Sequence, residues 1–414
     1  MSTTKTVDDA YWRDVIDPGD RASRLAKDIC FRSHRNSSRV LIVPNQPGNF
    51  RGPVGFLWTH DILRKMSNYH VDSGGNVVGW ELMEAVENDG AGGKSQFLTF
   101  LGEEAAFRSH GWEIITMTRD DFARSGRLAV ILDNEMNVRR ITDKNFPFFQ
   151  ATMEGYGDAL AKAHMVNITG ETAIMRHSIT AFCDVNDDNQ LVLTWGASCI
   201  GLCARDKLID GSRIAPGMPI IGLHEHGYRC NGGTFFTNLI LNKWGPDVRD
   251  AMQNETVRSF VRKLTVPSIS YARLIEDLVG WHGVSWHGQP PDIRGVAHIT
   301  GGGVWGKFKE ILPPGVGADL HSMPEPPVVL REAQELSQGT PYQLSDYQAY
   351  GTLHGGCGML VICAPGSEVH VLNQAGKLGI KASFVGSTIA SPVNEVLIGS
   401  KFMGGKALSS ERPN

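Results

Sequence analysis

The chain has no long apolar run: nowhere do about 18 apolar residues follow one another, as a membrane-spanning helix requires. It also lacks an excess of one charge, since 40 Lys and Arg stand against 44 Asp and Glu, for a formal net charge of −4. That balance gives no electrostatic reason to expect nucleic acid or a membrane as a partner. The first residues lack the apolar core of a secretory signal, so we expect a cytoplasmic protein.

Cysteine pairs at metal-binding spacing are missing as well. The seven cysteines are scattered and form no CxxC pair, so we expect reduced thiols. Cys30 and Cys230 are better interpreted as packing residues than as nucleophiles. His224 and His226 would share one face of a strand, but no Cys/His pair stands at zinc spacing, so a metal site there is not favoured.

The length and pattern predict a mixed α/β protein with two domains, because 414 residues exceed one ordinary core. We place the domains at 1–205 and 206–405, with a loose tail at 406–414, because 204–219 is polar and turn-rich. The β-like runs are 39–43, 96–101, 112–117, 128–132, 191–203 and 359–364. The expected helices begin at Asp17 and cover 149–163, 234–244 and about 268–280. Residues 46–88 and 281–292 are predicted to be irregular insertions.

The densest chemical signal is GVAHITGGGVWGKFKEILPPGVGADL (295–320). Three consecutive glycines leave backbone N–H groups free to surround a phosphate, although a lone glycine triplet is more often a structural turn. With AHIT before the triplet and a helical pattern after it, the segment resembles the signature of the aminoimidazole ribonucleotide (AIR) synthetase family.

Other segments resemble motifs of the same family, in the same order. They are AYWRDVIDPGDRASRL (10–25), DGAGGKSQ (89–96) for DGVGTK, TRDDFARSG (118–126), ITGETAIM (168–175) for GGETAEM, ARDKLIDGSRIAPGMPIIGL (204–223), GYRCNGGTF (227–235) for GPHSNGYSL and TLHGGCGM (352–359). GAGGKS is not a P-loop, because Walker A needs a glycine at position 88, which is Asn. Asp89, Asp121 and Glu171 taken singly would more often be solvated turn acids; the surrounding motifs favour a functional role.

The resemblance implies an enzyme that uses ATP and Mg²⁺ to convert formylglycinamidine ribonucleotide into AIR in purine biosynthesis. ATP would phosphorylate an amide oxygen to give an iminophosphate, a nitrogen of the substrate would attack the carbon, and phosphate would leave. The family fold is α/β in two halves. The N-terminal halves pair in a homodimer whose strands form a shared β-barrel, with ATP near the interface.

The resemblance also implies which residues act. Those expected in catalysis are Lys94, Asp89, Asp121 and His298. Those expected to bind the nucleotide cofactor are Asp17, Gly19, Gly90, Gly92, Gly170, Glu171, Thr172 and Asn231. Those expected to bind the substrate phosphate are Thr300, Gly301, Gly302, Gly303 and Arg229. Mg²⁺, which prefers one or two carboxylates with phosphate oxygens, would be held by Asp89, Asp121 and Glu171.

Three positions depart from the family pattern near the expected substrate. Arg229 replaces a histidine, Ile174 replaces a glutamate, and Glu310 stands where the family has an arginine. Either Arg229, with Lys307 or Lys309, has taken over the cationic role, which we favour, or the substrate is different. The alternatives are therefore another ATP-dependent enzyme of the superfamily and a catalytically silent nucleotide-binding homologue.

Overall fold

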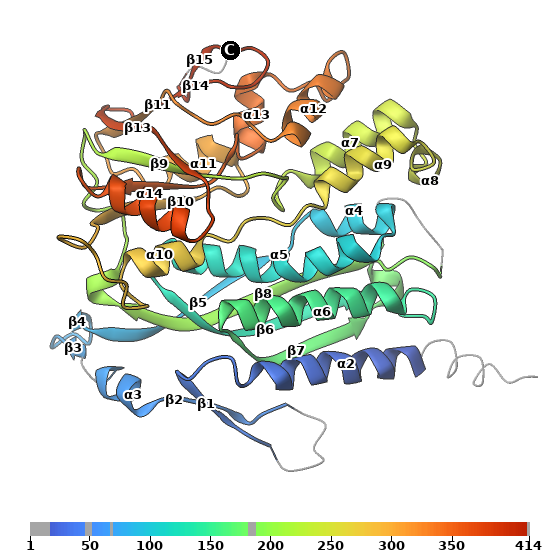
Figure 1. The fold of residues 1–414 in the computed structure, drawn as a ribbon, viewed down its shortest axis with the longest axis horizontal. Coiled ribbons are helices and arrows are strands. Elements are labelled where there is room, and N and C mark those ends of the chain that lie inside the picture. The colour runs from blue at the N-terminus through green and yellow to red at the C-terminus, as the bar shows by residue number, and fades with distance from the viewer. Residues whose placement is uncertain (1–16, 46–51, 67–68, 181–187, 412–414) are drawn as a thin grey trace, which may run out of the picture.

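The computed structural model describes residues 17–45, 52–66, 69–180 and 188–411. Its architecture is α/β, with one large β-sheet in each half of the chain and two two-stranded sheets in the first half (Figure 1). The chain passes from the first sheet to the second between Ala204 and Pro219, which brackets the predicted domain boundary. That each half is a separate domain stays a prediction.

The sheet of the first half has four strands in the order β5-β8-β6-β7. Their bounds are β5 Leu82–Gly90, β8 Leu193–Ala204, β6 Leu128–Val138 and β7 Val166–Ile174. β8 pairs antiparallel with both β5 and β6, whereas β6 and β7 are parallel. Parallel neighbours need a crossover, and helix α6 (Phe146–Ala163) supplies it. The strands predicted at 128–132 and 191–203 and the helix at 149–163 are therefore confirmed.

Helices α4 (Lys94–Leu101), α5 (Glu104–Ala123) and α2 (Asp17–Ser33) also belong to this half. The start of α2 confirms the predicted helix at Asp17, and Cys30 lies inside it. The strands expected at 96–101 and 112–117 were wrong, because both segments are helical. An apolar run does not distinguish a buried helix from a buried strand. Figure 1 shows α5 between the first sheet and the second half of the chain, and most of its residues are buried, so the polar face that marks a surface helix is missing.

The sheet of the second half has seven strands in the order β10-β12-β9-β13-β11-β14-β15. Their bounds are β9 Pro219–His224, β10 Ile293–His298, β11 Val316–Leu320, β12 Cys357–Cys363, β13 Ala382–Ala390, β14 Val396–Gly399 and β15 Ala407–Ser409. All pairs are antiparallel except β11 with β14. Strand β12 confirms the prediction at 359–364. The loose tail expected from residue 406 was wrong, since β15 pairs with β14 there.

Eight α-helices accompany this sheet in the part of the chain that the structure describes. They are α7 Gly233–Trp244, α8 Val248–Ala251, α9 Glu255–Leu264, α10 Ala272–Leu278, α11 Gly303–Lys309, α12 Val328–Ser337, α13 Asp346–Thr352 and α14 Glu368–Lys377. Helix α7 confirms the prediction at 234–244, with Gly245 as its C-cap. Helix α10 is shorter than the predicted span.

The described residues of segment 46–88 are largely regular, not irregular as predicted. They contain β2 (Gly55–Trp58), α3 (His60–Met66), β3 (Tyr69–Val71) and β4 (Val77–Trp80). β2 pairs with β1 (Val40–Val43), which confirms the strand predicted at 39–43, and β3 pairs with β4.

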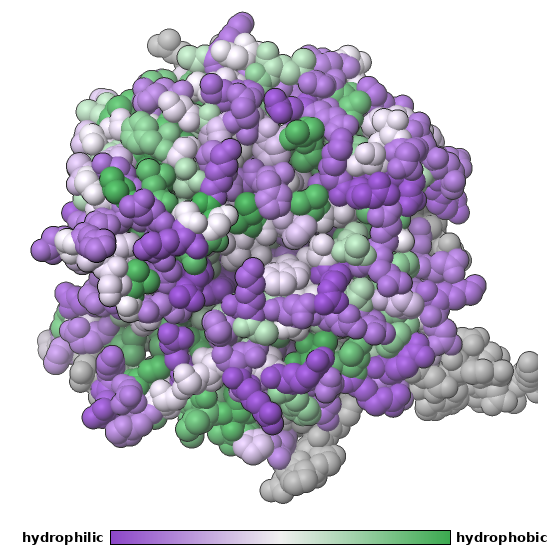
Figure 2. Space-filling view, in the orientation of Figure 1, coloured by the Kyte–Doolittle hydropathy of each residue, from purple (hydrophilic) through white to green (hydrophobic). Residues whose placement is uncertain are grey.

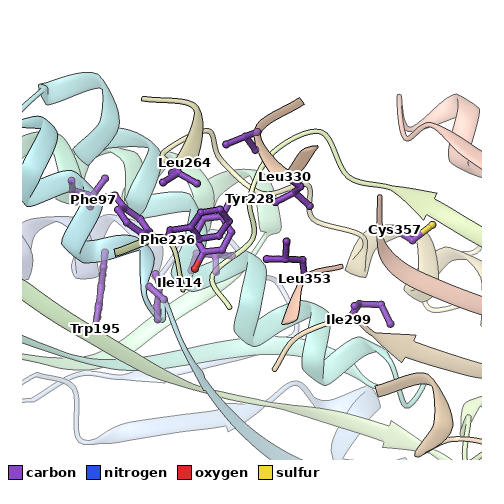
Figure 3. Close-up of a cluster of buried hydrophobic side chains, with 14 of the residues drawn as sticks. Phe97, Ile114, Trp195, Tyr228, Phe236, Leu264, Ile299, Leu330, Leu353 and Cys357 are labelled. Carbon is purple, nitrogen blue, oxygen red and sulfur yellow. The ribbon is translucent and has the colours of Figure 1, made fainter. Parts of the chain in front are cut away.

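One hydrophobic core runs from the first half into the second (Figure 3). Phe97 of α4 meets Tyr228 edge-on at 5.9 Å between ring centroids, and Phe236 of α7 lies 4.7 Å from Tyr228. Such edge-to-face aromatic pairs add about 0.5–1.5 kcal/mol each beyond their buried area. The core therefore fixes the start of α4 against the loop that leads into α7.

Candidate functional site

Three helices begin at glycines in neighbouring parts of the structure. The N-cap residues are Gly93 for α4, Gly232 for α7 and Gly302 for α11, and none makes a side-chain capping hydrogen bond. The first N–H groups of a helix have no partner within it, and the helix dipole adds positive potential. Three such starts together suit a ligand with several anionic oxygens.

Contacts between the glycine motifs bring the three starts together. A Cβ at Gly93 would lie 2.9 Å from Cα of Gly233, and a Cβ at Gly301 would lie 3.6 Å from Oδ1 of Asn231. Gly92 has a φ of +54°, and a Cβ there would lie 2.4 Å from the carbonyl oxygen of Cys230. The expected phosphate and nucleotide residues of loops 89–93, 227–233 and 300–303 therefore form one glycine-lined surface.

Asp89, Asp121 and His298 lie beside this surface. Asp89 precedes the last residue of β5, Asp121 is in the last turn of α5 and His298 ends β10. Burial raises the pKa of Asp89, and the nearby Asp121 carboxylate adds to the rise. Burial would also raise the pKa of Asp121, but a hydrogen bond from His298 (Nδ1 to Oδ1, 3.3 Å) and the charge of Arg124 lower it. The negative charges of Asp89 and Asp121 repel each other, and a cation bound between them would relieve that repulsion.

The side chain of Arg229 points into the protein interior and is buried. Nη1 donates to Glu225 Oε2 (2.8 Å) and to the carbonyl of Ile269 (2.9 Å), and Nη2 lies 3.1 Å from Asp120 Oδ2 and 2.9 Å from His298 Nε2. Burial would lower the pKa of Arg229, but the Glu225 carboxylate and the other acidic groups around it raise it well above its usual value. The phosphate-binding role predicted for Arg229 does not fit this geometry, because its four Nη hydrogens already have partners.

The hydrogen bond between Arg229 and His298 determines which ring nitrogen of His298 carries the proton. Guanidinium groups only donate hydrogen bonds, so Nε2 of His298 must accept from Arg229. The ring proton then lies on Nδ1 and is donated to Asp121. Arg229 thus positions His298, and through it Asp121, from behind the site.

Lys94 does not face the glycine-lined surface either. Its fully buried Nζ contacts Glu113 Oε1 at 2.7 Å and the carbonyl of Val266 at 2.6 Å. Burial acts to raise the pKa of Glu113, but the charge and hydrogen bond of Lys94 lower it, so the two groups form a buried ion pair. The contact with a transferred phosphoryl group that we predicted for Lys94 does not fit this placement.

The three carboxylates expected to share Mg²⁺ are not together in one chain. Asp89 pairs with Ala197, Ala197 with Asn134, and Asn134 with Gly170, the residue before Glu171. Three strand spacings of about 4.8 Å separate Asp89 from Gly170 by about 14 Å. In the part of the chain that the structure describes, no three His, Cys, Asp or Glu side chains are grouped for a metal ion.

Gly170, Glu171 and Thr172 line a different cavity of about 430 Å³, bounded also by residues of α2 and α6. Gly19 belongs to the same region, since a Cβ there would lie 2.9 Å from Ile174 of β7. Asp17 is the first residue of α2. The expected nucleotide residues therefore fall into two groups on opposite strands of the sheet.

Sequence reasoning missed three buried acids that hold the site. Glu113 pairs with Lys94, Glu225 pairs with Arg229, and Asp120 accepts from the backbone N–H groups of Tyr271 and Ala272 at the start of α10. None of the three left a local signal, since Glu225 stands four residues before Arg229 but the two residues do not lie on a helix, where that spacing would predict a pair.

The structure also places other side chains that the sequence analysis considered. The His224 ring bonds to Ser383 Oγ (2.7 Å) rather than facing His226 across a metal site. The six cysteines in the described ranges are free thiols. Trp281, in segment 281–292, donates to the carbonyl of Gly126 (2.8 Å). No helix in the described ranges is long and apolar enough to cross a membrane.

Two solved structures share the fold. Escherichia coli HypE, a hydrogenase maturation protein, matches with a TM-score of 0.53 and 14% identity over 93% of this chain and 95% of its own. Thiamine-monophosphate kinase from Stenotrophomonas maltophilia K279a matches with a TM-score of 0.52 and 13% identity over 89% and 94%. These likenesses support the predicted α/β fold class; they leave the dimer and the shared barrel untested.

Sequence comparisons give more specific relatives. Phosphoribosylformylglycinamidine cyclo-ligases of Vigna unguiculata, named chloroplastic/mitochondrial, and Magnetococcus marinus are 24% and 27% identical. The first match covers 83% of this chain and 82% of the relative, and the second covers 72% and 76%. Residues 289–399, which contain the glycine triplet, match the family described as AIR synthase related protein, C-terminal domain. The chain is thus similar to AIR-forming cyclo-ligases over most of its length, and it matches the AIR synthase related family within residues 289–399.

Proposed function

We propose that this protein is an ATP-dependent cyclo-ligase that converts formylglycinamidine ribonucleotide to AIR in purine biosynthesis. The observation that carries the proposal is the meeting of three glycine-started helices, α4, α7 and α11, beside Asp89 and Asp121. Two phosphorylated reactants need several donors for anionic oxygens in one place, and the names of the relatives supply the reaction.

The residues present suit Mg²⁺ and the polyphosphate of ATP. Mg²⁺ is commonly bound through one or two carboxylates and the phosphates of the substrate, and Asp89 and Asp121 provide that pair. When bound, the metal would neutralise charge on the phosphates. The backbone N–H groups of the glycine motifs would hold phosphate oxygens at fixed positions, which supports phosphoryl transfer by orientation and electrostatics.

A homodimer is part of the proposal. Glu171 is far from Asp89 within one chain, and in the described residues β5 and β7 each pair with a single neighbour, which leaves both sheet edges open. A second N-terminal half that continued the sheet would cover these edges and bring a second copy of Glu171 near the interface.

A second candidate function is ATP-dependent activation of a different amide or carbonyl compound. Arg229 has its Nη groups occupied, Lys307 pairs with Glu310 at 3.1 Å, and Lys309 pairs with Glu411 at 2.5 Å. This pairing supports a substrate that does not need the arginine that the family has near the glycine triplet. If the ribose phosphate is bound, the backbone N–H groups of Gly301 and Gly302 and the hydroxyl of Thr300 would have to hold it, because the N–H of Gly303 donates to the carbonyl of Thr300.

The rate of ADP release with Mg·ATP separates the candidates. Release that requires formylglycinamidine ribonucleotide supports the cyclo-ligase, and release with another amide or carbonyl acceptor supports the second function. No release with any acceptor would show a catalytically silent homologue. Asp121→Asn is the control, since it should abolish a genuine turnover and leave a contaminating ATPase unchanged.

A further inference from the structure

Hydrophilic residues predominate on the face of the molecule shown in Figure 2, with hydrophobic residues in small groups between them. A mixed surface of this kind does not by itself select a ligand. Selective contacts come from polar side chains that are shielded from water and have no partner in the protein, because a ligand can supply the missing hydrogen bond. Two such side chains, Gln96 and Tyr228, lie where helices α4 and α7 begin.

The two side chains meet at Gly233, the first residue of α7. A Cβ at Gly233 would lie 3.0 Å from Nε2 of Gln96 and 3.1 Å from the hydroxyl oxygen of Tyr228. Both distances start from one point, so the two polar atoms are no more than about 6 Å apart. The same point lies 2.8 Å from Cα of Gly93, the N-cap of α4. The amide and the hydroxyl therefore lie at the junction of the two helix starts, which we name the α4–α7 junction.

Neither polar group is satisfied in the part of the chain that the structure describes. The hydroxyl of Tyr228 is buried and forms no hydrogen bond, and the half-buried side chain of Gln96 forms none either. The ring of Tyr228 is held by the core, with its centroid 4.7 Å from that of Phe236 (Figure 3). A buried donor without an acceptor costs free energy, so the hydroxyl needs a partner. Rotation about the terminal bond of Gln96 turns an amide oxygen towards it.

The junction also differs from the family motifs at three positions. Gly93 replaces the threonine of DGVGTK, Gly233 replaces the tyrosine of GPHSNGYSL, and Tyr228 replaces the proline of the second motif. A Cβ at Gly93 or at Gly233 would come within 2.9 Å of Cα of the other residue, so only glycines allow the two helix starts to touch. The polar side chains at this contact are therefore particular to this chain.

We propose that Gln96 is a specificity-determining residue that binds a carboxamide group of the substrate, and that Tyr228 is its positioning residue. Oε1 of Gln96 accepts a hydrogen bond from the Tyr228 hydroxyl, and Nε2 donates to the oxygen of the substrate amide. This inference rests on the proposed function, whose substrate carries an amide oxygen that ATP would phosphorylate. It adds the side chain that recognises that group.

The charges near the junction favour a neutral group. The first N–H groups of α4 and α7 carry partial positive charge, which disfavours a cation. A carboxylate is usually met by a lysine or an arginine. Lys94 instead directs its Nζ to Glu113, and Arg229 directs its Nη groups to Glu225 and other buried partners. A neutral carbonyl oxygen is therefore the acceptor that best suits Nε2 of Gln96.

Isothermal titration calorimetry with formylglycinamidine ribonucleotide tests the assignment, because it measures binding without turnover. Gln96→Leu should raise the Kd of the ribonucleotide at least about fivefold, since the amide oxygen loses its donor, and should leave the Kd of Mg·ATP within about twofold of wild type. Tyr228→Phe keeps the ring and should weaken the ribonucleotide about threefold, but should add nothing in the Gln96→Leu background. A purely structural role of the hydroxyl would give an additive effect.

Two control variants remove the same groups elsewhere. Gln150→Leu changes an exposed glutamine of α6, and Tyr347→Phe removes a half-buried hydroxyl that donates to the carbonyl of Ser410. Both should bind the ribonucleotide and Mg·ATP as the wild type does. Circular dichroism shows that each variant is folded.

Four results would overturn the inference. They are a ribonucleotide Kd within about twofold of wild type in Gln96→Leu, an equal loss of Mg·ATP binding, additive effects of Gln96→Leu and Tyr228→Phe, and tighter binding by Gln96→Glu. The last result would show that the bound group is a cation such as an amidine, because a carboxylate cannot donate to an amide oxygen.

Failure of the proposed function is a separate outcome. If the wild type does not bind the ribonucleotide, ADP release from Mg·ATP is measured with acetamide and glutamine and with acetate and glutamate. Release with an amide that is weakened by Gln96→Leu would remove the proposed function and leave this inference standing. Release with the carboxylates alone, or with none of the four, would overturn both.

Discussion

Replacing Arg229 with methionine should destabilise the protein far more than an ordinary substitution. The guanidinium is 2% exposed and lies between the buried carboxylates of Glu225 and Asp120. Methionine has a similar length but no charge, so both carboxylates would lose their cation while staying buried.

The structure sets the size of this effect. Removing one partner of a buried ion pair costs about 3–5 kcal/mol, because the remaining charge stays desolvated. Asp120 keeps three other hydrogen bonds and Glu225 keeps those from the backbone N–H groups of His226 and Ile269, which limits the loss to that range. We expect Arg229→Met to lower the free energy of unfolding by about 3–5 kcal/mol.

Urea unfolding of wild type, Arg229→Met and Arg229→Lys measures the effect. Lysine keeps the charge but has one donor group, so its loss should be smaller. Adding Glu225→Gln to Arg229→Met should recover part of the stability, because it removes an uncompensated charge. A loss below about 1 kcal/mol for Arg229→Met, with no recovery in the double variant, would show that the cluster is solvated and that our account of Arg229 is wrong.

Three further predictions concern pH, the metal site and the glycine motif. Burial lowers the pKa of both His110 and His354 from 6.5 to about 4, so both are neutral when folded. The unfolded chain binds more protons than the folded chain between these pKa values, so the free energy of unfolding should fall as the pH drops from 6.5 towards 4. Each histidine accounts for a loss of about 2–3 kcal/mol at pH 4.5. In urea unfolding, His110→Leu should therefore show a loss on acidification that is smaller than that of the wild type by about this amount. Asp121→Asn should lower turnover by about 100-fold or more with an unchanged circular dichroism spectrum. Gly303→Ala should cost more than about 2 kcal/mol, because the residue has a φ of +59° and the new Cβ would lie 2.2 Å from a backbone oxygen, whereas Gly306→Ala, with open space in the same helix, should be neutral or stabilising.

The sequence predicted the strands and helices that are marked by a short apolar run or by residues typical of a helix start. The strands at 128–132 and 359–364 are short buried apolar runs between turn residues, and the helix from Asp17 has a cap, a proline and an acid in its first turn. Helix α5 was mistaken for a strand because burial on nearly all sides removes the helical period of its polar residues.

The candidate site was predictable as a set of loops but not as side-chain geometry. The glycine motifs predicted backbone that can approach a ligand closely, and the structure brings loops 89–93, 227–233 and 300–303 together. The directions of Lys94 and Arg229 depend on Glu113 and Asp120, which are 19 and 109 residues distant in the chain. No local pattern marks such pairs, because a buried cation is stable only where the fold brings a carboxylate to it.

The most direct test of the central claim is the yield of AIR per ADP when the purified protein is given formylglycinamidine ribonucleotide, ATP and Mg²⁺. The account predicts one AIR and one phosphate for each ADP, with no ADP formed when the ribonucleotide is left out. ADP release without AIR, or no turnover by a folded protein that binds Mg·ATP, would contradict it.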